Sequence, residues 1–295
     1  MKMWKLTGMA ALAILTITGV QSCKKSADAN MDAENITSAQ DFATSETEFA
    51  GAFDISDDIN QSDGKIKKGA STILPSGAVF TWIDTSFIDG DGIEYSVDFG
   101  PLKTTTPKGL LCGDGKYRAG ILHVTVSARY LNIGTVVAVT AADADKYYSG
   151  DGVNMFQLQG TMAITRTGAE EITVVIQNGK VTDMNNLTAT FQGTKVIKRI
   201  AGGSTPGILG DQYEVTGSGS GVNREGDNYT WQITTPLLKR IEAGCARTFV
   251  KGIIEIKNIS ANRSLKVDFD PFGNGACDRT AKAIIGTREI IFTVR

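Results

Sequence analysis

Histidine is almost absent from this 295-residue chain, which contains only His123. A histidine-dependent triad would have to use that one residue, and a zinc site would have no second imidazole. His123 shares a strand face with Thr125 and Ser127, so we interpret it as a solvent-side or hydrogen-bonded residue. The G-x-S-x-G, H-E-x-x-H and phosphate-loop motifs are missing as well. We therefore expect a protein that is not an enzyme, with no catalytic residue, cofactor or metal.

An excess of positive charge is also missing. The 30 Lys and Arg residues are outnumbered by 32 Asp and Glu, and no basic cluster repeats along a periodic face. Because nucleic-acid binding requires such a basic footprint, we expect no nucleic-acid partner.

Proline is scarce, with 6 residues, whereas the 33 glycines separate short runs rich in Val, Ile, Thr and Tyr. This composition is typical of a β fold with many glycine turns.

Charge is absent from the segment Leu6–Val20, which follows the basic residues Lys2 and Lys5. The apolar run has about 15 residues, short of the roughly 20 that a helix needs to cross a bilayer. A basic start, a short apolar run and a small residue before a cysteine predict a signal peptide at residues 1–22. The end of the segment resembles a lipobox, so we expect Cys23 to carry lipid, including palmitate. An ordinary cleaved signal peptide is the alternative.

The remaining chain divides into three parts. Residues 23–38 are small, polar and charged, and predict a flexible tether. Residues 39–69 predict an amphipathic helix, over Asp41–Asn60, and a linker. We interpret the acidic side chains of this helix as solvated surface. Residues 70–295 predict an all-β domain. The apolar side chains at roughly helical spacing are Phe42, Phe49, Phe53 and Ile59.

The β domain is predicted from residues that alternate with a period of two, as in Ile93–Phe99. About a dozen such strands, joined by glycine turns, predict antiparallel meanders. They would form a β-sandwich or a strongly curved sheet, beside one short N-terminal helix. The segments 97–114 and 267–278 repeat the order strand, loop, cysteine, and this echo suggests two related halves.

Three cysteines follow Cys23, so at most one intrachain disulfide can form among Cys112, Cys245 and Cys277. We favour the pair Cys245–Cys277, because both residues stand at the start of C-terminal strands and an envelope compartment is oxidising. Three buried thiols are the alternative.

Two groups of residues are weak ligand candidates. Asp89 and Asp91 lie in an acidic turn that could hold calcium, although Asp-Gly pairs also mark ordinary turns, which we favour. A carboxylate pair there could in principle hydrolyse a glycoside. Tyr147 and Tyr148 could stack on a sugar ring or contact a partner protein, whereas a strand-edge packing role is the more common one.

Several short segments from about residue 92 onward occur in a characteristic order, namely Val97–Gly100, Asp114–Gly120, Tyr147–Tyr148, Gly160–Thr161, Thr167–Gly168, Gly226–Trp231, Ile233–Leu237 and Gly275–Asp278. In these segments the chain resembles a family of uncharacterised outer-membrane lipoproteins of Bacteroidota. The resemblance implies a cellular location and a fold type, without an assigned activity. The residues that follow Cys23 lack the compact acidic run associated with surface export in these bacteria, so the periplasmic and cell-surface sides are both open.

The sequence thus predicts a cell-envelope protein that is anchored to the outer membrane by lipid at Cys23. Its expected role is non-catalytic, either structural or in contact with an envelope protein. Binding of a glycan or another nutrient at the cell surface is the alternative, and an envelope hydrolase is the least favoured function.

Overall fold

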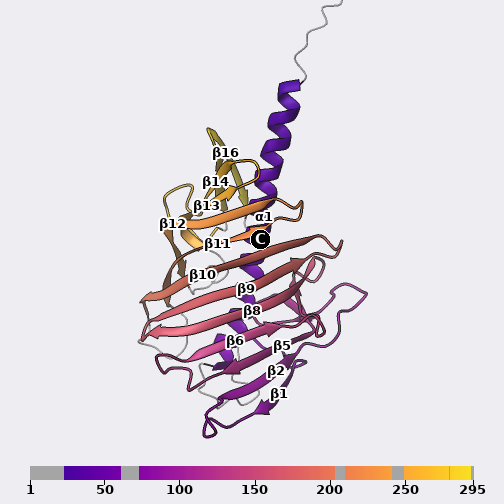
Figure 1. Ribbon diagram of the computed structural model, residues 1–295, viewed down its shortest axis with the longest axis vertical. Helices are drawn as coiled ribbons and strands as arrows, with labels where there is room; N and C mark the ends of the chain where they lie inside the picture. Colours follow the sequence, from indigo (N-terminus) through magenta and orange to yellow (C-terminus); the bar gives the residue numbers. More distant parts are fainter. Residues whose placement is uncertain (1–22, 61–72, 203–209, 241–248, 279, 294–295) are drawn as a thin grey trace, which may run out of the picture.

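A computed structural model describes residues 23–60, 73–202, 210–240, 249–278 and 280–293 (Figure 1). The predicted signal peptide at 1–22 lies outside these residues, as does Cys245. Among the described residues, no helix combines the length and the apolar character needed to cross a membrane.

The fold is one antiparallel sheet of sixteen strands that is not closed, which confirms the predicted mainly β class and leaves the single sheet rather than the sandwich. Strand neighbours follow the order of the chain, so the sheet is a long meander; the short strands β3, β4 and β7 pair at its side. The bounds are β1 Val79–Asp84, β2 Ile93–Asp98, β3 Leu110–Leu111, β4 Tyr117–Ala119, β5 Ile121–Val126, β6 Val136–Ala141, β7 Tyr148–Gly150, β8 Met155–Gly168, β9 Glu171–Thr182, β10 Thr188–Ala201, β11 Gln212–Val222, β12 Asn228–Arg240, β13 Phe249–Asn258, β14 Arg263–Asp268, β15 Thr280–Ile285 and β16 Arg288–Thr293.

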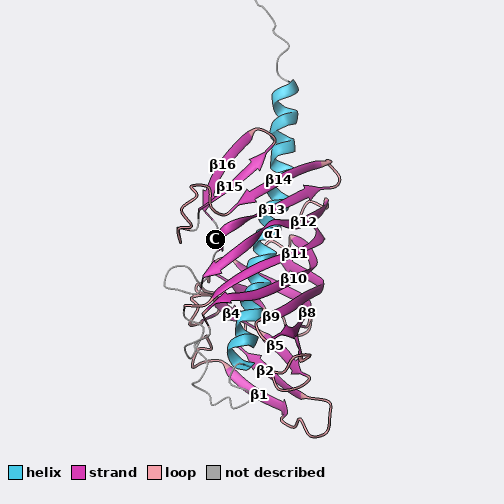
Figure 2. Cartoon of the chain, turned by 90° about the vertical axis from the view of Figure 1, so that its left-hand side faces the viewer, coloured by secondary structure: helices cyan, strands magenta, loops and turns pink. Residues whose placement is uncertain are grey.

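Helix α1, Cys23–Asn60, crosses the strands on one face of this sheet (Figures 1 and 2). With 38 residues it is longer than the short helix that the sequence predicts, and residues 23–38, the predicted tether, belong to it. The segment has no proline and a single glycine, Gly51, so no strong helix breaker interrupts it. The predicted duplication of two halves stays a prediction.

The core lies between α1 and the sheet. Phe42 and Phe49 of the helix pack against Phe191 of β10, with ring centroids 5.9 Å apart in each pair. Phe191 in turn stacks on Trp231 of β12 at 5.6 Å. Gly193 makes room for this cluster, because a Cβ atom there would lie 2.4 Å from Cζ2 of Trp231.

Three acidic side chains of the helix are buried, so the prediction that its acidic face is solvated surface is wrong for them. Asp41, Glu46 and Glu48 are buried, with residue exposures of 5%, 9% and 5%. They tolerate burial because the sheet supplies a cationic partner to each of them, as the next section describes.

Candidate functional site

Tyr147 is a core residue, which agrees with the favoured packing interpretation and removes this tyrosine as a weak candidate for stacking on a ligand. Its side chain is fully buried, and its hydroxyl accepts a hydrogen bond from Nε of Arg118 at 3.1 Å. Burial raises the pKa of this hydroxyl. Tyr148 opens the short strand β7 and is half-buried. Strand β7 pairs with β4 on one side and with β8 on the other, which encloses the tyrosine pair.

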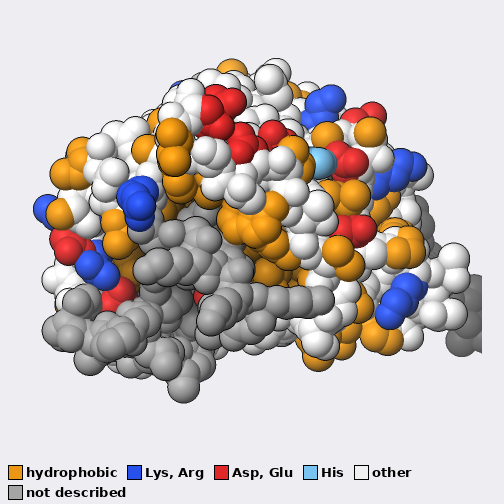
Figure 3. Space-filling view, turned by 90° about the horizontal axis from the view of Figure 1, so that it is seen from below, with side chains coloured by type: hydrophobic (Ala, Val, Ile, Leu, Met, Phe, Trp, Pro, Cys, Tyr) orange, Lys and Arg blue, Asp and Glu red, His pale blue; other side chains and the backbone are white. Residues whose placement is uncertain are grey.

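Asp89 and Asp91 lie close together, with Asp84 as a third neighbour whose carboxylate is within 4.8 Å of theirs. The pKa of Asp91 is raised by the hydrogen bond that its protonated carboxyl makes to Asp89 and then by the negative charge of Asp89. Figure 3, a view from the β1 end, shows acidic side chains gathered on this face. Exposed acidic turns are common without an ion, so calcium binding there stays a prediction.

His123 of β5 is hydrogen-bonded, which is one of the two roles that the sequence predicts for it. Its Nε2 atom lies 2.9 Å from Oδ2 of Asp145, and its side chain is about one third exposed.

The two cysteines of the β domain that the structure describes differ in state. Cys277 is disulfide-bonded, whereas Cys112 is a buried free thiol whose pKa is raised by burial. Because Cys245 lies outside the described residues, the pair Cys245–Cys277 stays a prediction.

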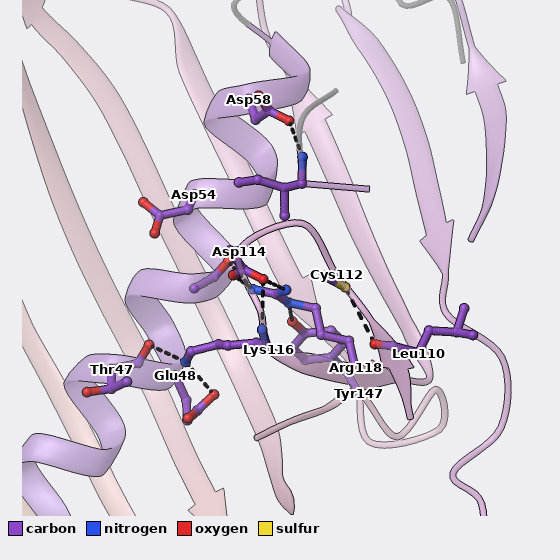
Figure 4. Close-up of polar contacts among 12 residues, drawn as sticks. Thr47, Glu48, Asp54, Asp58, Leu110, Cys112, Asp114, Lys116, Arg118 and Tyr147 are labelled. Atoms are coloured by element: carbon purple, nitrogen blue, oxygen red, sulfur yellow. Dashed lines mark hydrogen bonds and ion pairs between the residues drawn. The ribbon is translucent and has the colours of Figure 1, made fainter. Parts of the chain in front are cut away.

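A buried arginine joins the helix to the sheet (Figure 4). Arg118 of β4 has no exposed side-chain surface, and its guanidinium donates to both carboxylate oxygens of Asp114, at 2.8 and 2.6 Å. It also donates to the carbonyl of Gly51 in α1 at 3.4 Å. Burial alone raises the pKa of Asp114, but the hydrogen bonds and charge of Arg118 outweigh it and lower that pKa. This two-fold contact is the strong geometry for an arginine–carboxylate pair.

Lys116 adds a second tie beside this arginine. Its Nζ atom donates to Oε2 of Glu48 at 2.9 Å and to the carbonyl of Thr47 at 3.0 Å, both in the helix (Figure 4). Nearly three turns further along the helix, the carboxylate of Asp58 accepts a hydrogen bond from the backbone N–H of Ile73 at 3.2 Å. The β3–β4 hairpin is therefore fixed to the middle of α1.

The other ion pairs along the helix have the same arrangement. Helix α1 supplies the carboxylate, and the rest of the domain supplies the lysine or arginine. Lys195 of β10 donates to Glu46 at 2.6 Å, and Arg224, in the β11–β12 turn, donates through Nε to Asp41 at 2.7 Å. Lys239 of β12 lies 3.6 Å from Asp54. With Lys116–Glu48, four ion pairs hold the helix on its sheet, and they set its position along and around its own axis.

A cleft of about 220 Å³ lies between one flank of α1 and the strands β8 to β13. Its walls combine apolar and charged side chains from the helix and from several strands, and the buried pair Lys195–Glu46 is part of the lining. The apolar lining includes Phe49, Phe53, Met162, Ile172, Val174 and Ile197. Apolar concave surfaces with a few polar groups are the usual form of small-molecule sites.

The rim of the cleft is charged, and Arg199 is paired there with two carboxylates. Nε of Arg199 donates to Glu170, and its Nη1 atom lies 3.3 Å from Asp211. The hydrogen bond from Arg199 lowers the pKa of Glu170. Tyr130 donates its hydroxyl to Asp57. The lowered pKa of Glu170 differs from the raised carboxyl pKa that a general acid requires.

No single segment of the sequence marks this cleft, since its lining is drawn from residues 46 to 249. The spacing of Phe49 and Phe53 was the part of the sequence that pointed toward this region. It predicted a packing face on the helix and no cavity beside it. Comparison of the chain with protein-family models, with curated proteins and with solved structures found no match. The resemblance to Bacteroidota lipoproteins therefore stays a prediction.

Proposed function

We propose that this chain is a non-catalytic, lipid-anchored protein of the cell envelope that binds a small apolar or amphipathic molecule in the cleft beside α1. The observation that carries the proposal is the cleft itself, about 220 Å³ in volume, with a group of apolar side chains from α1, β8, β9 and β10 on its wall. Burial of apolar ligand surface in such a space is favourable by roughly 25 cal/mol per Å².

The ion pairs of the helix support this function. A cavity between packed layers costs stability and normally collapses. Here α1 is fixed by Lys195–Glu46 on the lining itself and by Lys116–Glu48 nearby, so the helix cannot easily move into the space. A held-open apolar cleft is the arrangement that a binding protein needs.

The paired rim carboxylates support the non-catalytic part of the proposal. Glu170, Asp54 and Asp57 each have a described partner, in Arg199, Lys239 and Tyr130. A hydrolase that used two of them would need one kept protonated near neutral pH, and the lowered pKa of Glu170 is the opposite of this.

Titration of the apolar fluorophore N-phenyl-1-naphthylamine into residues 23–295 with Cys23→Ser tests the proposal. We expect saturable fluorescence enhancement with about one site per chain. Ile197→Trp should remove most of it, because Ile197 of β10 lines the cleft. Val196→Trp is the matched control, since adjacent strand residues point to opposite faces. Equal enhancement in both variants, or none in the parent protein, would contradict a binding role for the cleft.

A further inference from the structure

We infer that the cleft takes a free, single-chain amphiphile with an alkyl or acyl chain of about eight carbons and an uncharged head group. This inference rests on the proposed binding function and specifies its ligand. It follows from the size of the cleft, the nature of its interior and the state of the charges at its rim.

The size of the cleft limits the chain length. One water-sized group takes up about 30 Å³, so 220 Å³ holds roughly seven or eight such groups. A methylene group is of about that size. A membrane lipid with two long chains exceeds the space several times over, whereas one short chain fills it.

The interior suits a hydrocarbon chain rather than a sugar or a peptide. Val174 and Met162 are 1% and 2% exposed, and Phe49 of the helix closes the opposite wall at 3%. These side chains offer no hydrogen bond to a hydroxyl or amide group. A polar ligand group placed among them would lose its hydration without compensation.

The rim disfavours a charged head group of either sign. An anion would approach Asp54 and Glu170, and a cation would approach Lys239 and Arg199, and each of these four residues is already neutralised by a partner across the rim. Arg166 donates to the carbonyls of Tyr130 and Ala169. An uncharged head group that carries hydroxyls can add hydrogen bonds at this rim without breaking an ion pair.

The test is displacement of N-phenyl-1-naphthylamine by n-alkyl β-glucosides of four to twelve carbons, below their micelle concentrations. We expect the dissociation constant to fall about fourfold for each added methylene, the equivalent of about 0.8 kcal/mol, and to level off near eight carbons. Octyl glucoside should bind at least about tenfold more tightly than octanoate or octylammonium. Vesicles of a two-chain phosphatidylcholine should not displace the probe.

Two variants make the test specific. Ile197→Trp fills part of the cleft and should move the plateau to a shorter chain, whereas Val196→Trp should leave it in place. Lys239→Met removes the partner of Asp54 and should raise the affinity for octylammonium relative to octanoate. Continued tightening through twelve carbons, or a preference for a charged head in the parent protein, would overturn the inference while leaving the binding function intact. Absence of probe binding would instead reject the proposed function.

Discussion

Lys195 and Glu46 are separated by 149 positions in the chain, and the Nζ atom of one lies 2.6 Å from Oε1 of the other. Their side chains are only 8% and 12% exposed, so the pair is almost wholly removed from water. The contact joins the middle of α1 to the middle of the sheet, beside the cleft. It is thus a sensitive point at which to test how the helix is held.

Glu46→Gln should destabilise the protein by about 3 kcal/mol, because it leaves the ammonium of Lys195 buried without a counter-charge. The double variant Glu46→Gln/Lys195→Met should recover much of this loss, since no buried charge remains. Urea unfolding followed by tryptophan fluorescence measures both. If the double variant were less stable than Glu46→Gln, the buried pair would not be the cause.

Asp114→Asn should lower stability at neutral pH and change its pH dependence. Arg118 lowers the pKa of Asp114 in the folded protein. A carboxyl with a depressed folded pKa adds stability that is present above its unfolded pKa and is lost as the pH falls through the folded value. The gap in unfolding free energy between parent and variant should therefore be largest above about pH 5 and should shrink below about pH 4.

Unfolding curves at intervals between pH 3 and pH 7 measure this gap. Asp91→Asn is a useful control, because its carboxyl is exposed and its pKa is shifted upward rather than downward. A gap between parent and Asp114→Asn that stays constant over the whole range would show that the ionised carboxylate is not what stabilises this site.

Tyr147→Phe should cost about 1–3 kcal/mol, because it leaves Nε of the buried Arg118 without the acceptor that the hydroxyl provides. Tyr148→Phe is the matched control one residue away on a half-buried side chain, and we expect a change below about 0.5 kcal/mol. Thermal unfolding compares the two. Neither variant should alter probe binding, and a selective loss of binding in Tyr147→Phe would restore the tyrosine pair as a ligand site.

Cys23→Ala should release the protein from membranes, because two or more acyl chains on one cysteine are what give a stable anchor. Fractionation of cells followed by immunoblotting measures the membrane-bound share. Cys112→Ala, which removes the buried free thiol, should leave that share unchanged. Sedimentation of Cys23→Ala with membranes would contradict the lipoprotein prediction.

Most of the long strands were predictable because the local pattern decides them, whereas the short strands β3 and β7 were not predicted. Residues Ile93–Asp98 alternate between buried and half-buried positions along β2, as a period of two requires. The helix was predictable over its apolar C-terminal half for the same reason. Its start was not, because the small polar residues after Cys23 fit a tether and a helix equally well.

The burial of the acidic helix residues could not be predicted, because the cause lies elsewhere in the chain. Whether Glu46 is solvated depends on a lysine in β10, and no local pattern connects the two. The full burial of Tyr147 could not be predicted for a similar reason, since its environment is set by Arg118 and by the strands on both sides of β7. The cleft is a product of packing alone.

The order in which this fold can be completed follows from the place of α1 at the start of the chain. Asp41 binds Arg224, which is made 183 residues later. At ribosomal speeds of about 5–20 residues per second, between about 10 and 40 s separate the two. During that interval Phe42 and Phe49 have no sheet to cover them, and most of the stability of a helix in a protein comes from the packing of its apolar face. Among the described elements, the first in the chain is thus among the last to be seated.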